Sequence, residues 1–174
     1  IKKWKKYVLY FGRLTKEKRV DLVIKSFEKS GLQNFKLLII GVGEDEERLK
    51  KIAENCEKEI KFLGFVSTEK LIEYISHASF TITLEWADYN LTVYESIALG
   101  TRVIFGKNFE EEPFDLPFIK SKMLFYVKPN IDEVSNLMNE VSKLPDVKLE
   151  DYNFIRNYNW DWYVNNFLML FEDE

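Results

Sequence analysis

Short apolar runs alternate along the chain with segments in which apolar residues recur at helical spacing. The runs that predict strands are residues 7–11, 36–40, 60–63, 79–84, 102–105 and 124–127. The segments that predict helices are residues 20–27, 44–55, 67–75, 91–99, 131–143 and 149–171. This alternation predicts an α/β domain, a three-layer Rossmann-like parallel sheet of about six strands with helices on both faces. In such sheets ligands bind beyond the carboxyl ends of the strands, so we expect functional residues in the loops that follow them.

Composition narrows the function classes. The 174 residues include 25 Lys and Arg and 29 Asp and Glu, which gives a net charge of −4. The composition therefore lacks the basic excess that is typical of nucleic-acid-binding proteins. No apolar run reaches the ~18 residues of a membrane span. The single cysteine, Cys56, excludes a disulfide framework, and with a single histidine, His77, the chain has too few thiolate or imidazole ligands for a typical metal site. We therefore expect neither a metal nor a cofactor.

Residues 1–6 are short and basic and lead directly into the first predicted strand. We interpret them as a linker stub and residues 7–174 as one domain, cut from a longer protein. A cytoplasmic location is expected. Because Lys and Trp also suit a membrane surface, peripheral contact of the full protein with the inner face of the membrane stays open.

The loop after the first predicted strand carries cations at an unusual place. Lys16, Lys18 and Arg19 crowd the start of the first predicted helix, where the backbone is partly positive and acids are usual. A phosphate or diphosphate bound at that turn would relieve the repulsion. A solvated basic patch, partly offset by Glu17 and Asp21, is the alternative.

The loop before residues 91–99 offers a second place for an anion. Asn90 is a good N-cap, so the free amides that follow it point into the loop. Glu95 lies among apolar residues one turn further on, where its carboxylate needs hydrogen-bond donors such as a sugar diol. A structural Glu bonded to backbone amides is the alternative.

Other candidate residues have simpler interpretations. Gly41-Val42-Gly43 lacks the third glycine of a dinucleotide fingerprint and runs into acids, so a tight turn is expected. The segment Gly64–Ser67 is a turn and helix cap whose backbone could border a flat aromatic ligand. His77 is expected to pack or to cap a helix, and Cys56 to be a small buried hydrophobe or an inert thiol.

Several segments occur in the order and spacing of a known family. They are YFGRLTKEKRVDLVIKSF, LLIIGVGEDEERL, IKFLGFVSTEKLIEYISHAS, LTVYESIALGTRVI and NWDWYVNNFLMLFE. From about Tyr7 to Phe171 the chain resembles the carboxyl-terminal, donor-binding half of family 4 (group 1) retaining glycosyltransferases, which have the GT-B fold. The resemblance implies transfer of a sugar from a UDP-, GDP- or ADP-sugar to an unknown acceptor with retention. It also implies an acceptor-binding amino-terminal domain as partner, absent from this chain.

The resemblance also implies site residues. The family's diphosphate-binding segment corresponds to Gly12, Arg13 and Lys18, and the segment that lines its nucleotide base corresponds to Gly64, Phe65 and Val66. The amides that approach the phosphates and the donor sugar correspond to Asn90, Leu91 and Thr92. The acid that binds the ribose corresponds to Glu95. Arg13 and Lys18 are the catalytic candidates, because they would stabilise the charge of the departing diphosphate. With these cations and helix amides available, no metal is needed.

One position departs from the family's Glu-x7-Glu motif. Eight residues before Glu95 stands Ala87, whereas the family has a Glu that touches the donor sugar, and Glu85 and Asp88 flank the gap out of register. A catalytically impaired nucleotide-sugar-binding module is therefore the alternative to an enzyme. In either case this chain alone is expected to turn over little or nothing.

Other classes fit the pattern less well. A receiver domain needs acids after the first strand, where Gly12 and Arg13 stand, and a dehydrogenase needs a glycine fingerprint there. A sugar-phosphate epimerase or a phosphorylase of similar architecture would also bind phosphate at such a turn, so these two classes stay open as alternatives.

Overall fold

The computed structural model describes residues 6–85, 91–106, 116–153 and 155. Its strands pair side by side in the order β3-β2-β1-β4-β5-β6. They are β1 (Tyr7–Phe11), β2 (Lys36–Ile40), β3 (Ile60–Gly64), β4 (Phe80–Thr83), β5 (Val103–Gly106) and β6 (Leu124–Val127). Every pairing is parallel, so the predicted six-stranded parallel sheet is confirmed.

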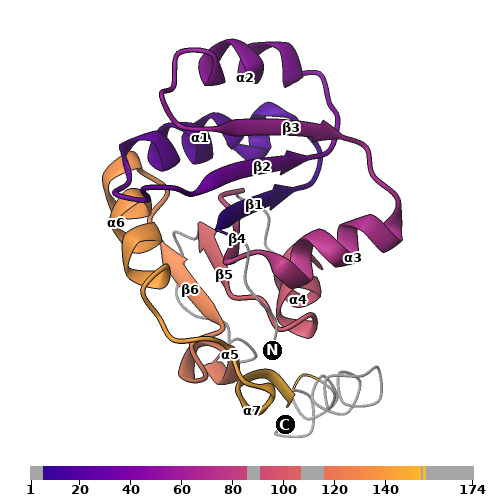
Figure 1. Ribbon diagram of the computed structural model, residues 1–174, viewed down its shortest axis with the longest axis vertical. Coiled ribbons are helices and arrows are strands. Elements are labelled where there is room, and N and C mark those ends of the chain that lie inside the picture. The colour runs from indigo at the N-terminus through magenta and orange to yellow at the C-terminus, as the bar shows by residue number, and fades with distance from the viewer. Residues whose placement is uncertain (1–5, 86–90, 107–115, 154, 156–174) are drawn as a thin grey trace, which may run out of the picture.

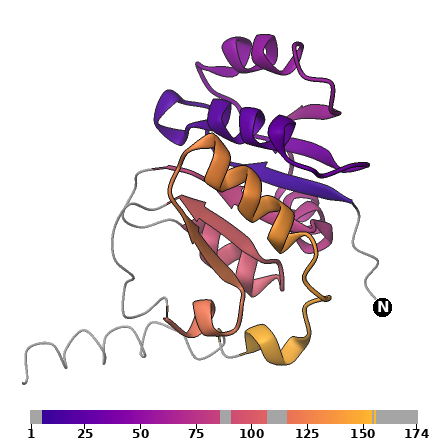
Figure 2. The same cartoon turned by 90° about the vertical axis from the view of Figure 1, so that its left-hand side faces the viewer.

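Helices cover both faces of this sheet (Figure 1). They are α1 (Val20–Lys29), α2 (Glu46–Ala53), α3 (Thr68–His77), α4 (Leu91–Ala98), α5 (Leu116–Lys120), α6 (Ile131–Val141) and α7 (Leu149–Tyr152), and a 3-10 turn, η1 (Lys16–Lys18), precedes α1. Helices α1 and α6 pack on one face of the sheet, whereas α3 and α4 pack on the other (Figures 1 and 2). The predicted three-layer architecture is therefore confirmed.

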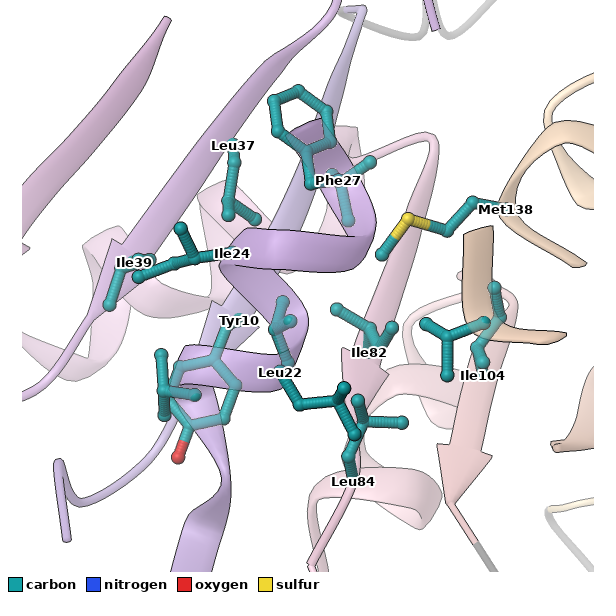
Figure 3. Close-up of a cluster of buried hydrophobic side chains, with 14 of the residues drawn as sticks. Tyr10, Leu22, Ile24, Phe27, Leu37, Ile39, Ile82, Leu84, Ile104 and Met138 are labelled. Carbon is teal, nitrogen blue, oxygen red and sulfur yellow. The ribbon is translucent and has the colours of Figure 1, made fainter. Parts of the chain in front are cut away.

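The largest core cluster lies between the sheet and the helices α1 and α6 (Figure 3). Helix α1 inserts Leu22, Ile24 and Phe27, and α6 inserts Met138. Full burial of a side chain of this size contributes about 1.5–3 kcal/mol. The strands that carry the loops discussed below are thus anchored in a well-packed core.

The boundaries of most elements agree with the sequence pattern. Helix α3 begins where expected, and the Ser67 side chain caps it by accepting a hydrogen bond from the Lys70 amide. Two short elements, η1 and α5, were not predicted, because neither has the length of a periodic pattern. Beyond Tyr152, most of the last predicted helix lies outside the described residues.

No helix in the described part of the chain has the length and apolar character to cross a membrane.

The strand order creates a switch point between β1 and β4. From β1 the chain proceeds to β2 on one side, whereas from β4 it proceeds to β5 on the other. The chain thus leaves β1 and β4 in opposite directions at the carboxyl edge of the sheet, and such a switch point is where open α/β sheets bind ligands. Candidate residues lie on the loops after both strands.

Candidate nucleotide site at the sheet edge

The loop after β1 is held beside the loop after β2 by backbone hydrogen bonds. The Gly12 amide donates to the Ile40 carbonyl and the Leu14 amide to the Val42 carbonyl, each over 3.0 Å. Residues 12–14 thus continue the pairing of the two strands beyond their ends. This places the basic loop at the carboxyl edge in a fixed position.

Glycines make this close approach of the two loops possible. A Cβ on Gly41, whose φ is +131°, would lie 1.9 Å from the Gly12 carbonyl oxygen, and a Cβ on Gly43 would lie 2.2 Å from the Leu14 oxygen. The Gly41-Val42-Gly43 motif is therefore structural, as expected. Its glycines are needed for the contact between two loops as much as for a turn.

The cations Lys16, Lys18 and Arg19 lie in and beside a short turn that precedes α1. Helix α1 begins at Val20 with Asp21 in its first turn, and Lys16 and Lys18 lie in the separate turn η1. Arg19 takes a left-handed conformation, with φ at 51°, and donates a hydrogen bond to the Pro129 carbonyl 3.1 Å away. The three cations therefore lie just before α1, with Arg19 at its N-cap, and the Arg19 side chain ties the loop to the segment before α6.

Arg13 and Lys18 are the two candidate catalytic cations of this loop. Arg13 is exposed, and its carbonyl accepts a hydrogen bond of 2.9 Å from the Tyr10 hydroxyl. Lys18 is mostly buried, with 23% of its side chain exposed. Burial and the charge of Arg13 lower the pKa of the Lys18 ammonium, whereas Glu17 opposes that shift. An anion bound beside Lys18 would offset the repulsion from Arg13.

Lys18 also reaches across the switch point. Its ammonium forms an ion pair with the carboxylate of Glu85, which directly follows the buried Leu84 at the end of β4. Only 5% of Glu85 is exposed. The contact joins the loop after β1 to the loop after β4, and it involves a residue that the sequence analysis did not assign to the site.

Helix α4 brings the acidic candidate to the same edge. A chain of hydroxyl hydrogen bonds holds this helix on β4: Thr81 donates to Ser96 over 2.8 Å, and Ser96 donates to the Thr92 carbonyl over 2.7 Å. Glu95 lies at the helix surface, and partial burial alone raises the pKa of its carboxyl. Among the described residues, no hydrogen-bond donor offsets this burial, so the Glu95 carboxylate is suited to accept hydrogen bonds from a ligand.

The segment after β3 forms the remaining side of the edge. Gly64 has φ at +64°, and its carbonyl accepts a hydrogen bond of 2.9 Å from the Gly41 amide. The Phe65 side chain is 85% exposed, whereas Val66 packs against the core between the sheet and α3. Phe65 is therefore the residue of this segment whose side chain is open to a flat ligand.

Parallel pairing brings the predicted site residues to one edge of the sheet. The described ones are Gly12, Arg13, Lys18, Gly64, Phe65, Val66, Leu91, Thr92 and Glu95. Asn90 and Ala87 lie outside the described residues. Glu85 was named from the sequence only as a neighbour of the Ala87 position, because the sequence does not show that its carboxylate is buried and therefore needs a partner.

The histidine and cysteine have the structural roles expected of them. The His77 Nδ1 atom lies 2.7 Å from the Glu73 carbonyl at the end of α3. Cys56 is half-buried, and burial raises the pKa of its thiol, which lowers its reactivity. Within the described ranges, no group of three or more His, Cys, Asp and Glu side chains is placed to hold a metal ion.

The fold defines a doubly wound α/β domain with charged residues at the carboxyl edge of its sheet. Residues 1–158 match the model of the family described as glycosyl transferases group 1. The chain belongs to that family. A Methanocaldococcus jannaschii protein that bears the name uncharacterized glycosyltransferase is 29% identical over 178 residues, which are 94% of this chain and 44% of the relative. The chain therefore spans less than half the length of that relative.

Solved structures show the same fold. The apo form of the lipopolysaccharide outer core galactosyltransferase WaaB is similar with a TM-score of 0.76 and 22% identity, over 92% of this chain and 47% of that one. TarM of S. aureus, in complex with fondaparinux, alpha-GlcNAc-glycerol and UDP, has a TM-score of 0.75 and 20% identity, over 97% and 36%. At these identities the likeness concerns the fold.

Proposed function

We propose that this chain is the donor-binding half of a glycosyltransferase and holds a nucleotide-diphosphate sugar at the carboxyl edge of β1 and β4. The observation that carries the proposal is the pair of cations, Arg13 and Lys18, on one side of the switch point with Glu95 on the other. A diphosphate needs cations, and a ribose diol needs a carboxylate that can accept its hydrogen bonds. A nucleoside diphosphate presents both groups.

The charge arrangement suits the chemistry of sugar transfer. As the bond between the anomeric carbon and the diphosphate breaks, negative charge builds up on the leaving phosphate. Arg13, Lys18 and the amides at the start of α4 would stabilise that charge, while Phe65 borders the base through its exposed ring. Retention of configuration is implied by the family resemblance alone.

The donor is proposed to be a UDP-, GDP- or ADP-sugar. The complex of the similar TarM structure with UDP supports a nucleotide of this kind. Because the chain spans 44% of its archaeal relative, we propose that a separate amino-terminal domain supplies the acceptor site. The isolated chain should then bind the donor but transfer little sugar.

A second function is supported by one observation. Ala87 stands eight residues before Glu95, where the family motif has a Glu that touches the sugar. A module that binds nucleotide sugars without transferring them would tolerate this change. Binding of the nucleotide is common to both functions, and transfer separates them.

Titration calorimetry tests the shared step. UDP, GDP and ADP are each titrated into the chain beside the matching phosphate-free nucleoside. We expect one diphosphate to bind clearly tighter than its nucleoside, with affinity that falls as salt rises, because the contacts are ionic. Equal or absent binding of all three diphosphates contradicts the proposal. A sugar-transfer assay on a protein with both halves then decides between the enzyme and the binding module.

A further inference from the structure

The ion pair between Lys18 and Glu85 has a role that the family motif does not assign. Glu85 is almost fully buried at the end of β4, while Lys18 comes from η1 on the far side of the switch point. A buried carboxylate is stable as an anion only beside a charge or hydrogen-bond donors. The contact therefore needs a functional or a structural explanation.

We infer that Glu85 is a positioning residue that keeps the Lys18 ammonium charged and fixed at the sheet edge, where it receives the donor diphosphate. This inference rests on the proposed function for the identity of the ligand. It assigns to Glu85 an action on Lys18 and no direct contact with the substrate.

The surroundings of Lys18 show why such a residue is needed. The Lys18 side chain is largely removed from water, and the neighbouring guanidinium of Arg13 repels it, so both influences favour the neutral amine. Glu17 is exposed and acts through solvent, which screens its charge. The contact with buried Glu85 is the one close anionic partner of Lys18 that the described residues provide.

The geometry of the pair also leaves Lys18 free to bind. An ammonium has more N–H donors than a single carboxylate oxygen uses, and part of the Lys18 side chain stays exposed. Glu85, in contrast, is 5% exposed and engaged with Lys18. Part of the Lys18 side chain is therefore open to a ligand, whereas Glu85 is almost closed to one.

Glu85 could also act in the opposite way, by competing with the ligand for Lys18, and the two roles predict opposite effects on binding. If Glu85 merely competed with phosphate for Lys18, removal of its charge would tighten binding of a diphosphate. If Glu85 maintains the charged and oriented ammonium, removal of its charge weakens binding, and more so at high pH, where Lys18 can lose its proton.

The experiment compares the unchanged chain with Glu85→Gln, and Glu17→Gln serves as the matched control in the same region. Calorimetry measures the affinity for UDP, or for GDP or ADP if one of these binds tighter, between about pH 7 and pH 10. For Glu85→Gln we expect the affinity to fall about tenfold or more, as for loss of a charge-assisted contact. The decline of affinity with rising pH should also begin at a lower pH than in the unchanged chain. Tighter or unchanged binding, or an equal effect of Glu17→Gln, overturns the inference.

A second measurement needs no ligand. Lysine amines are labelled with 13C-methyl groups, and NMR follows the Lys18 resonance, assigned through Lys18→Arg, as pH rises. Lys18 should lose its proton at lower pH in Glu85→Gln than in the unchanged chain. If it does while no diphosphate binds either protein, the proposed function is wrong and the assignment of Glu85 as the residue that keeps Lys18 charged still holds.

Identical titration of Lys18 in both proteins overturns the inference. Should Glu85→Gln fail to fold, Glu85→Asp takes its place. That variant keeps the charge but withdraws it by one methylene. Its Lys18 resonance should titrate between those expected for the unchanged chain and for a neutral residue 85, and an unshifted resonance counts against the inference.

Discussion

Removal of both cations at the sheet edge is the perturbation that the proposed site predicts most sharply. In Arg13→Ala/Lys18→Ala, a bound diphosphate loses two charge-assisted hydrogen-bond partners. Such bonds contribute about 1.5–3 kcal/mol each when one partner is charged. Arg13 is exposed, so its contribution belongs at or below the low end, whereas the mostly buried Lys18 belongs higher. A combined loss of at least about 2 kcal/mol is expected, which is about a 30-fold loss of affinity.

Calorimetry with the tightest-binding nucleoside diphosphate measures this loss. Lys18→Ala also removes the ion pair of the buried Glu85 carboxylate, so a urea denaturation curve is needed to show that each variant is folded under the assay conditions. Lys25→Ala is the matched control, because Lys25 is a cation of α1 with 49% of its side chain exposed. It should leave affinity unchanged. If the double variant binds as tightly as the control, the basic loop is a solvated surface and the reasoning fails.

Three further predictions concern the edge. Gly41→Ala should destabilise the chain by about 3 kcal/mol or more in urea unfolding, because its Cβ would meet the Gly12 oxygen at 1.9 Å, whereas Gly64→Ala, with open space, should cost only about 1–2 kcal/mol. Burial raises the pKa of Glu95, so its ionised form weakens the free fold. Glu95→Gln should therefore unfold at higher urea at pH 7, with a gain that disappears below about pH 4, and it should bind nucleotide less tightly. Phe65→Ala should leave stability within about 0.5 kcal/mol, since the ring is 85% exposed, yet cost about 1–3 kcal/mol of nucleotide affinity in calorimetry if it stacks on a base. Equal costs at the two glycines, an unchanged unfolding profile of Glu95→Gln, or unchanged affinity of Phe65→Ala would each contradict its prediction.

The strand pattern was sufficient to predict the fold because the sheet is buried on both faces. Segments such as Lys36–Ile40 are apolar beyond their first residue and are bounded by glycine or charge, so their limits are visible in the sequence. The turn η1 was not predicted, since a short 3-10 segment has no periodicity. Its presence changes where the basic residues lie relative to α1.

The site was predictable only as far as chain order determines it. Parallel strands bring Gly12, Gly64 and Glu95 to one edge, so their common location follows from the topology. The direction of each side chain does not follow from it. Arg19 turns toward Pro129 because it adopts a left-handed conformation, and Lys18 meets Glu85 because the loops after β1 and β4 face each other. Both contacts link residues far apart in the sequence.

A crystal structure of the chain with its tightest-binding nucleoside diphosphate tests the central claim most directly. The account predicts that phosphate oxygens lie within hydrogen-bond distance of Arg13 and Lys18 and that the ribose hydroxyls contact Glu95. A nucleotide bound elsewhere, for example in the groove between β6 and α6 lined by Tyr126 and Glu133, would contradict it.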